Sequence, residues 1–97
     1  MPGLSFARKA VDDIDEAVAW YSQFSPALAR RFSADVTAAV ERIQGAPLAW
    51  PPLGADRRHC LLTHFPYSVV YRTDGQELRV VAVVHHRRRP AIRQSRR

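Results

Sequence analysis

Residues 67–85 carry the sequence YSVVYRTDGQELRVVAVVH, and this stretch decides the fold. Two runs in it, residues 67–72 and 78–85, are rich in the β-branched and aromatic residues that favour strands. Residues 73–76 between them read TDGQ, and aspartate followed by glycine favours a tight turn. The stretch therefore predicts two antiparallel strands joined as a hairpin.

The chain before the hairpin predicts two more strands and a first helix. Residues 4–6 and 58–62 are short runs of strand composition. From about residue 10, apolar side chains recur on one helical face, at Val11, Ile14, Val18 and Tyr21. Carboxylates crowd the first turns expected for this helix, where they favour the positive end of its dipole: Asp12, Asp13, Asp15 and Glu16.

A second helix is predicted from Ser25-Pro26, because serine is a good N-cap and proline fits the first helical position. Its apolar residues recur at intervals of three or four: Leu28, Phe32, Val36, Val40 and Ile43. Gly45 followed by Pro47 indicates its end. The proline-rich residues after it predict a loop, with Trp50 packed on the core.

The expected order of elements is β-α-α-β-β-β, which defines an α+β fold. Two helices with one shared apolar side pack naturally as a hairpin on one face of a mostly antiparallel sheet. The chain has 97 residues, so we expect residues 1–97 to form one domain, ending in a basic tail from about residue 87.

We expect this protein in the cytoplasm and expect no association with a membrane. No apolar run approaches the roughly 20 residues of a membrane helix, and the N-terminus lacks a signal pattern. The single cysteine, Cys60, has no partner for an internal disulfide and is expected in the core. His59, Cys60 and His64 fit no common metal site, so we expect no metal and no cofactor.

The net charge of +6 lies in the second half of the chain. Residues 1–50 hold five basic residues against six acidic ones, a net −1, whereas residues 51–97 hold ten arginines against three acidic residues, a net +7. A planar guanidinium binds phosphate or carboxylate through two parallel hydrogen bonds. Binding of a polyanionic or acidic surface is therefore expected, most of all at residues 85–89, which read HHRRR.

Strand alternation predicts which of these cations meet. In the last strand we assign Leu78, Val80, Ala82 and Val84 to the helix side, and Arg79, Val81, Val83 and His85 to the outer face. Arg72 lies on the outer face of the middle strand by the same argument. Three neighbouring strands can then present Arg58, Arg72, Arg79 and His85 on a shared surface, and the lateral order of the strands, which the sequence does not give, decides whether these side chains converge. Two interpretations stay open: a phosphate-binding concavity with His85 as a proton-transfer group, or a solvated sheet face.

Several of these segments resemble the RelE/ParE toxin superfamily. They are Asp12-Asp13-Ile14, Tyr21, residues 25–32 (SPALARRF), Pro47, residues 65–71 (FPYSVVY) and residues 82–90 (AVVHHRRRP). The match spans nearly the whole chain, and the Phe-Pro-Tyr phrase and the His-to-Pro run are its most specific parts. Ala91-Ile92-Arg93 departs from the aromatic pair that many relatives carry after the Arg-Pro step.

The resemblance implies a toxin of a type II toxin–antitoxin module, neutralised by an acidic antitoxin. A toxin dimer, or a heterotetramer with the antitoxin, is a possible assembly. ParE-like members inhibit DNA gyrase, and this is the preferred hypothesis. Candidate target- or phosphate-binding residues are Arg79, Arg87, Arg89 and Tyr71.

Two alternatives remain. RelE-like members cleave mRNA on the ribosome; here His85 would be the base or acid, with Arg58, Arg72 and Arg88 as the cations. This chain lacks the lysine-rich constellation of the best-known ribosome-dependent members, since its only lysine is Lys9. The other alternative is an inactive basic domain that binds nucleic acid or protein.

Overall fold

A computed structural model describes residues 3–74 and 76–87 of the chain. Its elements follow the predicted order: β1 (Gly3–Phe6), α1 (Arg8–Ser22), α2 (Pro26–Gly45), β2 (Arg58–Leu61), β3 (Tyr67–Thr73) and β4 (Glu77–His85). Most of these helices and strands begin or end one or two residues away from the predicted bounds. The predicted α+β class and element order are confirmed.

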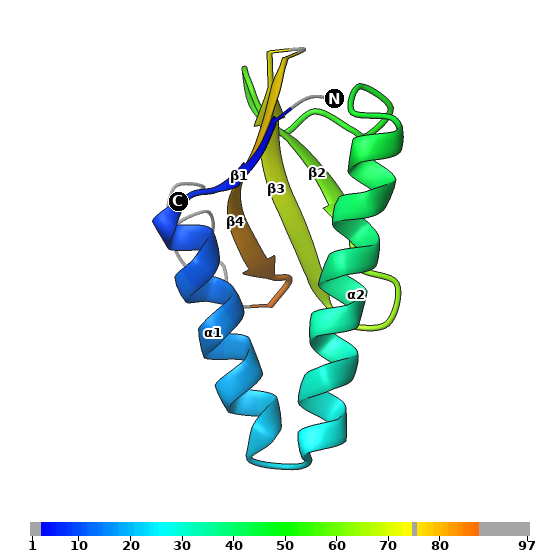
Figure 1. Cartoon of the computed structure of the whole chain (residues 1–97). Coiled ribbons are helices and arrows are strands. Elements are labelled where there is room, and N and C mark those ends of the chain that lie inside the picture. Colours follow the sequence, from blue (N-terminus) through cyan, green and yellow to red (C-terminus); the bar gives the residue numbers. More distant parts are fainter. Residues whose placement is uncertain (1–2, 75, 88–97) are drawn as a thin grey trace.

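The four strands form one mixed sheet in the order β1-β4-β3-β2. β1 runs parallel to β4, while β4, β3 and β2 are antiparallel to one another. α1 and α2 form a hairpin that covers one face of this sheet, and their connected ends extend beyond the sheet (Figure 1). We call the face away from the helices the outer face.

α1 begins at Arg8, four residues before Asp12, the first of the carboxylates in its sequence. Its first turn therefore contains no acidic residue, and the expected dipole contact is wrong for this helix. The carboxylates instead pair with cations four residues earlier: Arg8 Nε lies 3.2 Å from Asp12, and Lys9 Nζ lies 3.0 Å from Asp13. Such pairs add only a few tenths of a kcal/mol each to a helix.

α2 begins as the sequence predicts. The Ser25 hydroxyl accepts hydrogen bonds from the backbone N–H groups of Ala27 at 3.1 Å and Leu28 at 3.3 Å, and Pro26 fills the first helical position. The buried face of α2 includes Phe32, Val36 and Ile43. Within the described residues, neither helix is long and apolar enough to cross a membrane.

The core lies between the helical hairpin and the sheet. Phe32, Ile43, Val69, Tyr71 and Val80 are completely buried in it, each 0% exposed. Cys60 is 1% exposed and Trp50 packs against the same cluster, so both predicted placements are confirmed. The core fixes which face of each strand can carry a binding site.

β4 contains a bulge that changes the alternation of its side chains. Val70 pairs with Ala82 and Tyr71 pairs with Val80, so Val81 is an extra residue in β4. Leu78 and Val80 face the helices as predicted. Beyond the bulge it is Val83, 4% exposed, that enters the core, so the assignment of Ala82 and Val84 to the helix side is wrong.

Candidate functional site

Two arginines meet on the outer face, where β3 and β4 leave the hairpin turn. Arg72 and Arg79 are direct cross-strand partners, and Ser5 of β1 lies opposite Arg79 on the other side. Together with the turn they line a cavity of about 480 Å³, whose walls are Ser5, Asp56, Arg72, Thr73, Asp74, Glu77 and Arg79. This is the part of the predicted arginine surface that the fold brings together.

The two guanidinium groups have different neighbours. Like charges placed opposite each other destabilise an antiparallel pair. Arg72 Nη1 lies 4.0 Å from Asp56 Oδ2, so its charge is partly offset. Arg79 Nη1 donates to the Ser5 hydroxyl at 3.0 Å, and within the described chain no carboxylate lies at ion-pair distance from it. Arg79 is therefore the half-buried cation best placed to bind an added carboxylate or phosphate.

The turn beside these arginines is held by Asp74. Its carboxylate accepts hydrogen bonds from the backbone N–H groups of Gln76 and Glu77, both at 2.9 Å. These two hydrogen bonds stabilise the charged form and hold the pKa of Asp74 below its usual value. Asp74 and Glu77 bring negative charge to the rim, so the wall of the cavity has mixed charge and its cations are Arg72 and Arg79.

Arg58 does not join this pair. It lies opposite Tyr71, on the helix side of the sheet, and its Nη1 donates to the backbone carbonyl of Trp50 at 2.7 Å. The guanidinium thus fixes the loop that closes over the core. Arg58 and Arg72 do line one cavity of about 200 Å³, together with Asp56, Arg57 and Thr73, so only the predicted surface shared with Arg79 is wrong.

Tyr71 is a core residue. Its ring is 0% exposed, and its hydroxyl donates to the backbone carbonyl of Pro47 at 2.6 Å. Burial raises the pKa of Tyr71 above its ordinary value, and the positive charge of Arg58 partly opposes this. A side chain in this position has no surface on which a target could bind.

His85 lies on the helix side of β4, because the bulge at Val81 reverses the alternation before it. Its ring packs edge-on against Tyr67, with centroids 4.9 Å apart, and its Nδ1 accepts a hydrogen bond from the backbone N–H of Arg87 at 3.0 Å. The predicted exposure of His85 beside Arg79 on the outer face is therefore wrong.

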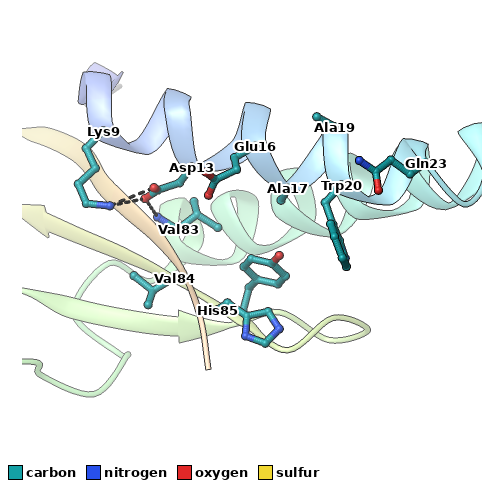
Figure 2. Close-up of a pocket in the computed structure, with 11 residues that line it drawn as sticks. Lys9, Asp13, Glu16, Ala17, Ala19, Trp20, Gln23, Val83, Val84 and His85 are labelled. Carbon is teal, nitrogen blue, oxygen red and sulfur yellow. Dashed lines mark hydrogen bonds and ion pairs between the residues drawn. The ribbon is translucent and has the colours of Figure 1, made fainter. Parts of the chain in front are cut away.

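His85 instead lines a groove between α1 and the end of β4 (Figure 2). The groove holds about 540 Å³, and its α1 wall includes Asp13, Glu16, Trp20 and Gln23. Asp13 joins the two walls, because its Oδ2 accepts from the backbone N–H of Val83 at 3.0 Å.

The sequence did not predict two polar contacts: that of Asp13 with Val83 in β4, and that of Ser68 with His86 after β4. Asp13 has the helical spacing of the buried residues Ala10 and Ala17, which is the signal that could have placed it at the sheet. Ser68, 4% exposed, lies 3.0 Å from Nε2 of His86, and the sequence carried no signal for that pair.

The remaining predicted residues are at the end of the described chain. Arg87 is exposed in the turn after β4, whereas Arg88 and Arg89 lie outside the described residues. Within the described part, no three metal-ligating side chains gather. The fold thus brings Arg72 and Arg79 together, joins Arg58 to Arg72 in a second cavity, and places Tyr71 and His85 elsewhere.

A helical hairpin on one face of a small mixed sheet is the architecture of the RelE/ParE class of toxins. The profile of the family described as "ParE toxin of type II toxin-antitoxin system, parDE" matches residues 4–90. The chain belongs to this ParE toxin family.

Two comparisons agree with this assignment. Toxin ParE2 of Mycobacterium tuberculosis, in strains CDC 1551 / Oshkosh and H37Rv, is 36% identical over 80 residues, which are 81% of this chain and 76% of the relative. The structure described as "Chromosomal ParDE TA system from P. aeruginosa" matches with a TM-score of 0.77 and 25% identity, over 88% of this chain and 96% of the other.

Proposed function

We propose that this chain is the toxin of a type II toxin–antitoxin module and that it arrests growth in the cytoplasm by binding DNA gyrase. The observation that carries the proposal is the ParE family match over residues 4–90. The M. tuberculosis relative is named as a toxin, and the P. aeruginosa structure is described as a ParDE toxin–antitoxin system.

The separation of His85 from the arginines supports inhibition by binding over RNA cleavage. Cleavage by a 2′-hydroxyl needs a base, an acid and cations that converge on one phosphate. Of the cations named for cleavage, Arg72 lies on the outer face and Arg58 is bonded to the backbone carbonyl of Trp50, while His85 lies in the groove on the helix side. One phosphate cannot contact groups on opposite faces of a sheet.

The antitoxin is proposed to be an acidic protein that contacts the outer face. Residues 51–97 carry a net +7, the excess of ten arginines over three acidic residues. A disordered acidic segment that folds on binding can cover a large surface of a small protein. We assign Arg79 to a carboxylate of this partner, because its guanidinium is half-buried and bonded only to the Ser5 hydroxyl among the described contacts.

The experiment that tests the proposal measures both target activities with one preparation. Purified protein is incubated with gyrase and relaxed DNA, and separately with ribosomes programmed with mRNA. Loss of supercoiling without mRNA cuts, reversed by the acidic protein encoded beside the toxin, is the expected result. Cuts at the ribosomal A site with normal supercoiling would overturn the proposal.

A further inference from the structure

The tip of the helical hairpin carries two aromatic rings that the core does not use. Trp20 is 46% exposed and Phe24 is 64% exposed, and their rings form an edge-to-face pair with centroids 5.5 Å apart. Tyr21 between them turns inward and stacks on Phe32. Tyr21 therefore packs against the core, whereas the Trp20–Phe24 pair lies outside the core.

The position of this pair suits contact with another protein. The connected ends of α1 and α2 extend beyond the sheet (Figure 1), and Trp20 in the last turn of α1 and Phe24 in the connection belong to this projecting part of the chain. Trp20 is also a wall of the groove, with His85 on the opposite wall (Figure 2). A partner could thus cover the rings and place a side chain in the groove at the same time. Exposed tryptophan beside a pocket is typical of residues that dominate protein interfaces.

The charge of the groove indicates which kind of side chain a partner would place in it. Asp13 is bonded to Lys9, and Asp12 is paired with Arg8. Asp15 and Glu16 have no cation at ion-pair distance among the described residues, and Glu16 lines the groove. Lys9 also lines the groove and is held by Asp13, so Glu16 is the carboxylate of the groove without a cation at ion-pair distance among the described residues, on a protein of net charge +6. An acidic antitoxin is repelled here, whereas a lysine or arginine of another protein is attracted.

We propose that the Trp20–Phe24 pair and the adjoining groove bind the toxin's target protein, through a segment with an apolar side chain and a lysine or arginine. This inference rests on the proposed function in taking the chain as a toxin that acts by binding a protein. It assigns target and antitoxin to different surfaces: the target to the hairpin tip, the antitoxin to the outer face of the sheet.

The test compares the double variant Trp20→Ala/Phe24→Ala with the wild type and with Leu48→Ala. Leu48 is 69% exposed in the loop after α2, so it controls for the removal of exposed apolar surface. Three quantities are measured: growth arrest on induction, half-inhibitory concentration for gyrase supercoiling, and affinity for the antitoxin. The double variant is expected to lose growth arrest and to need at least tenfold more protein for inhibition. Its antitoxin affinity is expected to stay within twofold of wild type, as in Leu48→Ala.

Two further variants keep the test decisive if the double variant folds poorly. Phe24→Ser leaves α1 intact, because Phe24 lies after the helix end at Ser22. Glu16→Lys reverses the charge of the groove at an exposed position. Both are expected to weaken growth arrest and gyrase inhibition with unchanged thermal unfolding.

The outcomes separate the two proposals. Wild-type inhibition of gyrase that all tip variants retain overturns the tip as the target site, and so does an equal loss of antitoxin binding. If the wild type arrests growth without affecting gyrase, the gyrase proposal fails. The tip is then judged by growth arrest alone, and retention of arrest in the tip variants overturns it. Absence of arrest by the wild type overturns both.

Discussion

The residue with the clearest dependence on pH is Tyr71. Burial favours its neutral phenol, so the folded pKa lies above the unfolded value of about 10. Its contribution to stability is fully present below that unfolded value and is lost as the pH rises through the folded pKa. We expect the free energy of unfolding to fall above about pH 10, with part of the tyrosinate absorbance at 295 nm appearing only on unfolding.

Two variants check this assignment. Tyr71→Phe should lose about 1 kcal/mol at neutral pH, because the hydrogen bond to Pro47 is gone, yet should depend less on alkaline pH. Arg58→Gln removes the charge that lowers the pKa of Tyr71, so its tyrosinate should form at still higher pH. An unchanged alkaline unfolding profile in Tyr71→Phe would show that another group controls it.

Asp13 is the residue that ties α1 to β4. Asp13→Ala leaves the backbone N–H of Val83 without its acceptor, and an unsatisfied partly buried donor costs about 1–3 kcal/mol. For a domain of this length, that lowers the Tm by about 5–20 °C. Asp12→Ala is the matched control, since it removes only the exposed pair with Arg8 and should change the Tm by a few degrees at most. Equal Tm shifts in the two variants, measured by calorimetry, would show that the hydrogen bond between Asp13 and Val83 does not stabilise the domain.

At the scale of the element, the cap of α2 was predictable because its signal is local. Ser25 satisfies two N–H groups, so Ser25→Ala should destabilise the domain by about 1 kcal/mol and lower the Tm by about 4–8 °C. Ser33→Ala, at an exposed site inside the same helix, should be nearly neutral. Thermal unfolding followed by circular dichroism distinguishes the two, and a neutral Ser25→Ala would mean that tertiary packing alone sets the start of α2.

The faces of the strands were predictable only up to the bulge in β4. Residues 80–84 read VVAVV, and a run without polar residues does not mark which side chains face inward. The extra residue Val81 therefore moved His85 to the helix side without any sequence signal. Arg58 was misplaced for a related reason: its face depends on its register with Tyr71, which is a long-range pairing. Arg72 and Arg79 were placed correctly because polar and apolar residues alternate around them.

For the molecule as a whole, the distribution of charge separates two kinds of binding. Arg72 and Arg79 lie on the outer face of the sheet, whereas Asp15 and Glu16, which have no cation at ion-pair distance among the described residues, lie on α1. The two proposals together assign an acidic partner to one side of this domain and a basic segment to the other. The sheet lies between the two surfaces, so the two sites can be tested by separate substitutions.

The outer face provides the prediction at this scale. Arg79→Gln should weaken antitoxin binding about tenfold, because a charge-assisted hydrogen bond contributes about 1–2 kcal/mol when partly desolvated. Arg8→Gln is the control: Arg8 is exposed at the start of α1 and should leave the affinity unchanged. Calorimetry at 50 and 500 mM salt should show wild-type affinity falling steeply with salt, and falling less in Arg79→Gln, because one screened contact is missing. If both variants bind as tightly as wild type and with the same salt dependence, the acidic partner binds elsewhere, and the assignment of the antitoxin to the outer face is wrong.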